Sequence, residues 1–138
     1  MKPGRMAVNE LVAHYTRRRA TIKEPAILIR INRTYRYGIK ESDLYDATRS
    51  AWKVGKRRRE KAKLAFSVFE DVVREVYQIE GWFEAGSTFN GRFEGGRAPR
   101  RARRWEFVGT IADERIRRRY VNRYVGHLFS PGAQNPIS

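Results

Sequence analysis

The sequence predicts a single α+β domain, because short apolar runs typical of strands alternate with segments whose apolar residues recur at helical spacing. The chain has 138 residues, a length that fits one domain. Apolar residues make up 41% of it and aromatic residues 12%, which is enough to form a core and argues against wholesale disorder. We expect residues 1–24 to form an N-terminal helical extension and residues 25–138 to form the domain itself.

The domain is expected to open with a strand followed by a helix. Ala26–Ile31 is nearly all apolar, which is typical of a strand buried on both faces. After a loop, an apolar set at helical spacing that includes Trp52 predicts a helix from Asp43 to about Val54. Ser42 is the expected N-cap of this helix.

Residues 63–80 fit either a helix or a β-hairpin. Their apolar residues recur at i, i+3, i+4 and i+7, yet many of them are β-branched or aromatic, as in strands. The hairpin would consist of Leu64–Phe69 and Val72–Ile79, with Glu70 and Asp71 as its turn. Neither turn residue adopts a positive φ easily, so this turn is a poor one for a two-residue loop. On the residues alone, both structures remain open.

The second half of the domain is expected to be a loop, a strand and a helix. Glycines and a proline interrupt residues 84–104, which predicts a long basic loop. Trp105–Ile111 is expected to be a strand, and Asp113 is expected to start an arginine-rich C-terminal helix over about Glu114–Phe129. The element order is then β-α-β-β-loop-β-α-β, with an extended tail at the C-terminus.

Basic residues dominate the charged composition. The 30 lysines and arginines outnumber the 15 acidic residues and give a net charge of +15. Such an excess is expected to contact the phosphates of a nucleic acid, although it could also form solvated faces. A membrane surface is less favoured as the partner, because no basic helix pairs its charge with a bulky exposed apolar face. The basic residues gather in four runs: Arg17–Arg19, Lys56–Arg59 with Lys61 and Lys63, Arg97–Arg104, and Arg115 with Arg117–Arg119.

The composition also excludes several classes of function. With no cysteine, the chain cannot be a disulfide scaffold, a thiol enzyme or a cysteine-based zinc or iron–sulfur protein. Its two histidines argue against a multi-histidine metal site. No apolar run approaches the ~20 residues of a membrane span, and no signal-peptide pattern follows the start. We expect a cytoplasmic protein with no cofactor and no metal.

Aromatic residues lie among the basic ones, as in proteins that stack unpaired bases. The segment Arg30–Tyr37 interleaves the two types directly after the first strand, and tryptophans flank the other basic runs. The tyrosines could instead pack on the rim of the domain, and the tryptophans in its core or on that rim. The predicted nucleic-acid-binding residues are Arg30, Arg33, Tyr35, Arg36, Tyr37, Arg49, Trp52, Lys53, Lys56, Arg57, Arg58, Arg59, Trp82, Arg101, Arg103, Arg104, Trp105, Arg117 and Arg118.

Five strings of this sequence are LIRINRTYRYGI, LYDATRSAWKVG, KAKLAFSVFEDVVREVYQIEGWF, RRWEFVGTIA and GAQNPI. Together they resemble a prokaryotic domain that is sometimes found beside GIY-YIG nuclease modules. The module itself is not expected here, because YRYGI at residues 35–39 lacks the paired GIY and YIG strands. The element order resembles the PUA-like superfamily, which includes the EVE, YTH and ASCH domains. That resemblance implies a small bent β-barrel with a helix after the first strand, and it favours the hairpin for residues 64–79.

The same resemblance implies the binding of RNA, or of another single strand or a flipped base. The pocket would lie between the first strand, the helix at residues 43–54 and the hairpin. There Asp46 or Thr48 could hydrogen-bond a base edge, although Asp46 is also spaced to pair with Arg49. The ASCH domains imply an alternative, a hydrolase of RNA or modified nucleosides that uses Lys53, Thr48 and Glu41. A third interpretation is an accessory module of a restriction or mobile-element system that acts through a protein partner.

Overall fold

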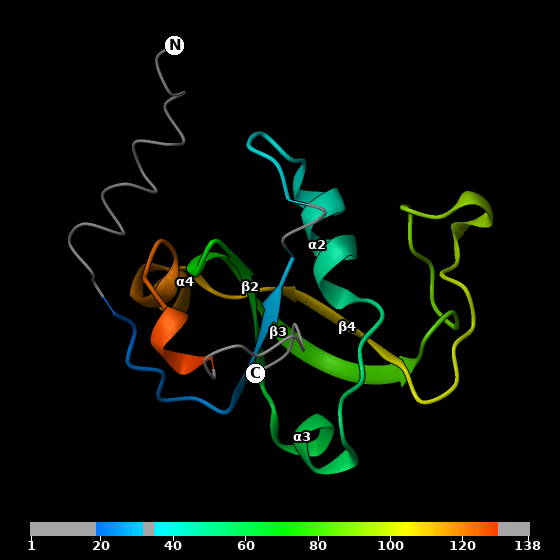
Figure 1. The fold of residues 1–138 in the computed structure, drawn as a ribbon, viewed down its shortest axis with the longest axis horizontal. Helices are drawn as coiled ribbons and strands as arrows, with labels where there is room; N and C mark the ends of the chain where they lie inside the picture. The colour runs from blue at the N-terminus through cyan, green and yellow to red at the C-terminus, as the bar shows by residue number, and fades with distance from the viewer. Residues whose placement is uncertain (1–18, 32–34, 130–138) are drawn as a thin grey trace.

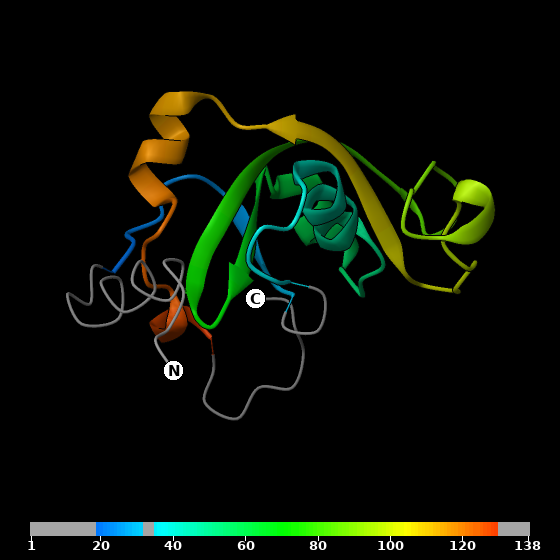
Figure 2. The same ribbon diagram turned by 90° about the horizontal axis from the view of Figure 1, so that it is seen from above.

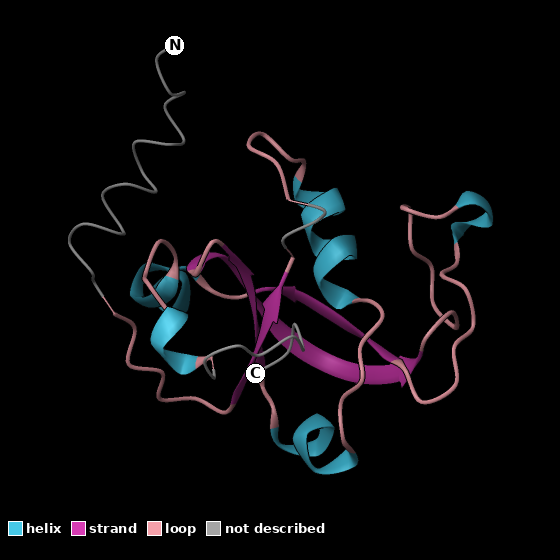
Figure 3. Ribbon diagram, in the orientation of Figure 1, coloured by secondary structure: helices cyan, strands magenta, loops and turns pink. Residues whose placement is uncertain are grey.

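The structure, a computed structural model, describes residues 19–31 and 35–129 (Figure 1). Most of the expected N-terminal extension at residues 1–24 lies outside the described residues, as do Arg33 and the expected C-terminal tail. Figure 3 shows the helices and strands, which in chain order are β1 (Ala26–Arg30), α2 (Glu41–Arg49), α3 (Lys56–Lys61), β2 (Leu64–Phe69), β3 (Val72–Glu84), the 3₁₀ turn η1 (Glu94–Gly96), β4 (Trp105–Ile111), α4 (Glu114–Tyr120) and the 3₁₀ turn η2 (Gly126–Leu128).

The four strands form one mixed sheet in the order β1-β2-β3-β4. β1 and β2 run parallel and are connected through α2 and α3, whereas the β2–β3 and β3–β4 pairs are antiparallel. This arrangement confirms the α+β class. The sheet is open across the described residues, with β1 and β4 as its edges, so the closed barrel that the resemblance implies is not found there. The PUA-like assignment itself stays a prediction.

Residues 64–79 form the hairpin and not the helix. The turn residues Glu70 and Asp71 both have positive φ, 51° and 64°, so the objection that they would not adopt this backbone is wrong. Positive φ at both positions gives the turn a twist that matches the strands. The Asp71 carbonyl accepts a hydrogen bond from Val125 N (2.8 Å). A tertiary contact thus helps to stabilise a turn that the two residues disfavour by themselves.

Apolar side chains on both faces of the sheet build two cores. Along β1, Ile27 and Ile29 point to the α2 side, where they pack with Leu44, and Leu28 points to the other side, where it packs with Tyr120 of α4. Figure 2 shows α2 inside the curve of β3 and β4, with α4 on the opposite side of the strands. The burial of β1 on both faces confirms the expectation from its apolar sequence.

The first helix of the domain is shorter than expected and begins earlier. α2 starts after Lys40, without the Ser42 cap, and ends at Arg49 rather than near Val54. The reason is Trp52, which leaves the helix and pairs with Trp105 through two backbone hydrogen bonds, N to O, of 2.9 and 2.8 Å. A residue that joins a strand in this way cannot stay helical. The following basic run then forms a separate short helix, α3.

The last helix is also shorter than expected. Asp113 caps α4 as predicted, because its Oδ1 accepts a hydrogen bond from Ile116 N (3.0 Å). The helix ends at Tyr120 and not at Phe129, since the next residues return to the sheet and Asn122 N donates to Val73 O (2.8 Å). Within the part of the chain that the structure describes, no helix is long and apolar enough to cross a membrane.

β3 and β4 lie very close together at Gly109. A Cβ atom at this position would lie 2.1 Å from the carbonyl oxygen of Gln78, much closer than atoms can pack. The approach lies beside an irregularity in the pairing between Ile79 and Gly81, where β3 bends. The glycine therefore permits the curvature that wraps the sheet around α2.

We predict that Gly109→Ala lowers the free energy of unfolding by more than about 2 kcal/mol, because the backbone must shift to admit the methyl group. Urea denaturation measures this change. Gly55→Ala is the matched control: it has open space at its Cβ and alters only the N-cap of α3, so its effect should stay near or below about 1 kcal/mol. Equal stabilities of the two variants would contradict the close approach.

Candidate nucleic-acid interface

Arg49, predicted to contact nucleic acid, lies inside the protein with 2% of its surface exposed. Its Nε donates to the Phe107 carbonyl (2.8 Å), its Nη1 to the Phe89 carbonyl (2.8 Å), and its Nη2 to the Thr88 hydroxyl. An arginine enclosed in this way cannot reach a phosphate, so we remove it from the candidate set. Its contacts instead join the end of α2 to β4 and to the loop after β3.

Glu106 is the buried counterpart of Arg49. Its carboxylate accepts hydrogen bonds from Gly86 N and Thr88 N (both 2.8 Å) and from the Thr88 hydroxyl, and it lies 3.8 Å from Arg49 Nη2. Burial alone would raise the pKa of Glu106, but the hydrogen bonds from Thr88 and Gly86 and the charge of Arg49 outweigh it and lower that pKa. Sequence reasoning missed this residue. The available signal was a carboxylate inside the apolar strand WEFVGTI.

The outer edge of β4 is covered by groups from α2 and the segment after it. The Tyr45 hydroxyl accepts a hydrogen bond from Gly109 N (3.0 Å), Arg49 Nε donates to the carbonyl of Phe107, and Trp52 pairs with Trp105. Residues 105, 107 and 109 are alternate residues of β4, so their backbone N–H and C=O groups point away from β3. These groups form hydrogen bonds with α2 and Trp52 where a further strand would otherwise pair. This cover fixes the path of the chain from α2 to Trp52, and hence the start of α3.

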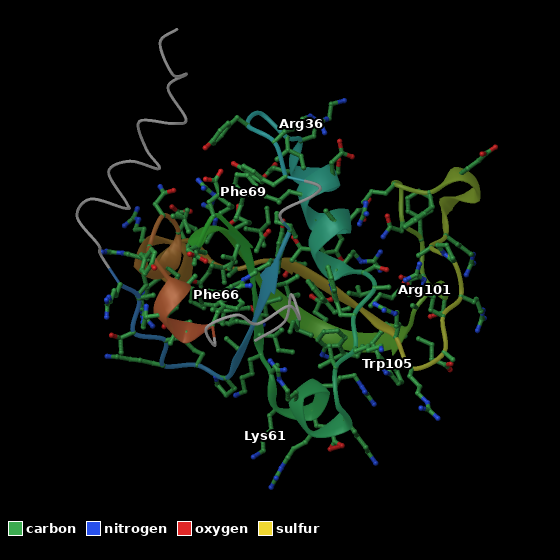
Figure 4. All side chains as sticks on the ribbon, viewed as in Figure 1. Arg36, Lys61, Phe66, Phe69, Arg101 and Trp105 are labelled. Carbon is green, nitrogen blue, oxygen red and sulfur yellow. The ribbon has the colours of Figure 1, made fainter. Side chains whose placement is uncertain are left out.

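Lysines and arginines fill the surface of α3. Five of its six residues are basic, all but Arg59 are exposed, and none forms a salt bridge with another described residue. Arg59 is half-buried: its guanidinium stacks over the ring of Trp105, 3.6 Å from the centroid, and also donates to the Val54 carbonyl. Figure 4 shows Lys61 pointing outward from this helix. Lys53 and Lys63, just outside the helix, are exposed too.

Two hollows lie against opposite faces of α3. The larger, of about 420 Å³, is lined by Arg59 of α3 and Trp82 of β3, together with Lys56, Glu60, Ala62, Ile79, Glu80 and Gly81. The ring of Trp82 rests against Phe107 at 5.5 Å, and its buried Nε1 has no hydrogen-bond acceptor among the described residues. The smaller hollow, of about 210 Å³, is lined by Arg57, Arg58 and Lys61 with Pro25, Ala26, Ile27 and Ala62.

The arginines of α4 are differently placed, because carboxylates accompany them. Arg117 binds Glu75 through Nε and Nη2 (2.7 and 3.1 Å) and Glu114 through Nη1 (2.9 Å). These partners raise the pKa of Arg117 and compensate its charge. Arg119 likewise binds Glu24 (2.9 Å). Arg118, predicted as a contact, is 79% exposed and lies 3.8 Å from Glu114.

The segment around Tyr35 packs against the hairpin. The ring of Tyr35 lies on Phe69 at 4.6 Å, and Tyr37 meets Tyr35 edge-on at 5.8 Å, as the rim-packing interpretation expects. Arg36 is exposed, whereas the guanidinium of Arg30 lies over the ring of Phe129 at 3.8 Å. This segment follows the end of β1, while α3 precedes the start of the parallel strand β2. The Tyr35 segment and the basic residues of α3 therefore lie at opposite ends of β1 and β2.

The pocket expected between β1, α2 and the hairpin is occupied by core side chains. Leu44, Tyr77 and Phe107 meet there with 8%, 1% and 0% exposure. Burial raises the pKa of Tyr77 well above its usual value. Asp46, considered there for a base edge, instead accepts a hydrogen bond from Gly91 N (3.1 Å), and burial raises its pKa. Thr48 is fully buried and donates to Leu44 O (2.7 Å).

The burial of Thr48 also bears on the hydrolase alternative. Glu41 starts α2 and Thr48 lies seven residues later, which is about 10 Å along a helix axis. Lys53 is exposed beyond the end of α2. The structure thus does not bring the three residues to one accessible place. Residues 19–31 and 35–129 also contain no group of three or more histidine or acidic side chains that could hold a metal.

The remaining predicted arginines lie in the loop before β4. Arg101 and Arg103 are exposed, and Arg104 is half-buried and donates to the Ala51 carbonyl (3.3 Å). Arg101 and Trp105 are labelled in Figure 4. Arg104 directly precedes Trp105, on which Arg59 stacks, so the end of this loop adjoins α3.

Comparison of the chain with known protein families, with curated proteins and with solved structures finds no match to any of them.

We predict that Glu106→Gln lowers the free energy of unfolding at pH 7 by about 2 kcal/mol. The change removes one of the two carboxylates, those of Glu106 and Asp46, that lie 3.8 Å from the buried guanidinium of Arg49, and it weakens the hydrogen bonds from Gly86 and Thr88. The folded-state pKa of Glu106 is lowered, so its ionisation stabilises the fold above the unfolded value of about 4.5. That stabilisation is lost as the pH falls through the lower folded-state value. Wild-type stability should therefore drop more steeply below pH 4.5 than that of the variant.

Chemical denaturation from pH 3 to 7 measures both curves. Glu94→Gln, at an exposed glutamate of η1, is the matched control and should follow the wild type. Parallel curves for wild type and Glu106→Gln would contradict the assignment of this carboxylate.

Proposed function

We propose that the protein binds single-stranded nucleic acid through the α3 surface, which consists of Lys53, Lys56, Arg57, Arg58, Arg59, Lys61 and Lys63. The observation that carries the proposal is the density of exposed cations on α3 without a salt bridge to any described residue. A phosphate backbone is the polyanion that such a surface fits. Each contact releases condensed counterions, and this release supplies the free energy of binding.

The contrast with α4 supports the choice of surface. Both helices are rich in arginine, but on α4 the carboxylates of Glu75, Glu114 and Glu24 bind Arg117 and Arg119. A phosphate would have to displace these carboxylates, whereas on α3 it meets cations that no described carboxylate neutralises. We therefore assign the phosphate contacts chiefly to α3.

The aromatic residues beside α3 support a single strand as the ligand. Trp82 lines the 420 Å³ hollow and Trp105 lies under Arg59, so indole rings border the basic surface. Unpaired bases stack on such rings whatever their sequence. The PUA-like resemblance favours RNA over DNA, and an RNA partner fits the cytoplasmic location predicted from the sequence.

The test compares charge reversal on the two helices. Arg57→Glu with Arg58→Glu should weaken binding of a labelled single-stranded RNA at least tenfold and reduce the slope of log K against log salt by about 1.4, since each lost phosphate contact removes ~0.7. Fluorescence anisotropy at several salt concentrations measures both quantities.

The matched control reverses Arg115 and Arg118 on α4, which changes the net charge equally at exposed positions. It should alter the affinity much less and leave the slope almost unchanged. Equal loss in both variants would mean that overall charge, not the α3 surface, determines binding. Absence of wild-type binding even at low salt would overturn the proposal.

A further inference from the structure

Phe89 is the most exposed of the large apolar side chains that the structure describes, with 74% of its surface accessible. It lies in the loop of residues 85–104 that connects β3 to β4, which we call the arm. Figures 1 and 2 show the arm projecting beyond the ends of these strands, at the end of the molecule away from α4. An aromatic ring that is exposed on a projecting segment offers a flat face to a ligand.

The backbone around Phe89 is held firmly despite this exposure. Its carbonyl accepts a hydrogen bond from the buried Arg49, and Asn90, the next residue, is fully buried. Across the arm, Asn90 N donates to Gly96 O (2.6 Å), and Gly91 N donates to Asp46 of α2 (3.1 Å). The ring is therefore presented on a fixed part of the backbone and not on a loosely attached loop.

Gly96 supports the ring from one side. A Cβ atom on Gly96 would lie 2.7 and 2.8 Å from two ring carbons of Phe89, so any side chain there would displace the ring. Gly96 also has a positive φ of 77°. The ring thus lies against backbone on one side, while most of its surface faces solvent. A planar platform of this kind fits the stacking of another flat group.

The charge of the arm indicates which flat group it would receive. Residues 85–104 contain six arginines and one acidic residue, Glu94. Arg97, Arg100, Arg101 and Arg103 are exposed along this segment. A membrane surface would require a wider apolar area, and Phe93, the other ring of the arm, is half-buried with Arg92 beside it at 5.3 Å. In a single-stranded nucleic acid, a base can stack on the ring of Phe89 while the phosphates contact the arginines.

We propose that Phe89 stacks on an unpaired base of the same single strand that binds α3, so that the arm forms a second contact. This inference rests on the proposed function. The end of the arm adjoins α3, because the arm ends at Arg104 and the next residue, Trp105, lies under Arg59 of α3. Stacking contributes affinity that does not depend on salt in the way that phosphate contacts do.

The test measures the affinity of three variants for a single-stranded RNA and for the same length of abasic backbone. Phe89→Ala should weaken RNA binding about 5- to 150-fold. Phe89→Trp should retain the wild-type affinity, because it keeps a ring for stacking. Leu128→Ala, which truncates an exposed apolar residue of η2, is the matched control and should bind like the wild type. All the proteins should bind the abasic backbone equally.

Cross-linking to an RNA that carries 5-iodouracil, followed by mass spectrometry, gives a direct second readout. We expect a cross-link at Phe89 in the wild type. If Phe89→Ala bound RNA as tightly as the wild type, the arm contact would be refuted while the α3 surface would stand. If the variant lost binding to vesicles of anionic lipid but not to RNA, a membrane would be the partner of the arm. If the wild type bound neither the single-stranded RNA nor the abasic backbone at low salt, the α3 proposal would be refuted, and this inference with it.

Discussion

The arrangement of the molecule depends on a buried hydrogen-bond network that runs from Arg49 through the Thr88 hydroxyl to Glu106. Removing these groups from water is costly, so they are stable only where the surrounding protein satisfies them. Here Gly86 N, Thr88 N and two backbone carbonyls complete the hydrogen bonds. This network fixes the arm to α2. Together with Tyr45 and Trp52 it also covers the edge of β4, and this cover sets where α3 begins.

The distribution of charge acquires meaning only once its partners are known. In the sequence, the runs in α3, the arm and α4 look equivalent, because each is a cluster of arginines. In the structure, Glu75 and Glu114 enclose Arg117, Arg49 is an internal residue, and Arg59 lies on Trp105. The arginines and lysines of α3 and of the arm form no salt bridge with a described residue, whereas carboxylates bind Arg117 and Arg119 of α4. An excess of positive charge in the whole chain thus becomes one surface with aromatic borders.

Much of the fold could be predicted from local patterns, and the remainder depends on contacts distant in sequence. The apolar runs placed β1 and β4, and Asp113 placed the start of α4. For β2 and β3 the same patterns also fitted a helix, and only the PUA-like resemblance favoured the hairpin. The ends of the helices could not be predicted, since Trp52 is held by Trp105 and Asn122 by Val73. The basic run of α3 was recognised as a candidate surface. No pattern in the neighbouring sequence indicates that Arg49 is buried or that Phe89 is exposed. Both depend on how segments distant in the sequence pack together.

The most direct test of the α3 surface is a titration of the ¹⁵N-labelled protein with a short single-stranded RNA, followed residue by residue in NMR spectra. The largest shifts should occur at residues 53–63, at Gly81 and Trp82, and at the indole N–H groups of Trp82 and Trp105. The signals of residues in α4 should hardly shift, and the shifts on α3 should diminish as salt is added. Shifts centred on α4, or none on α3 at saturating RNA, would contradict the assignment.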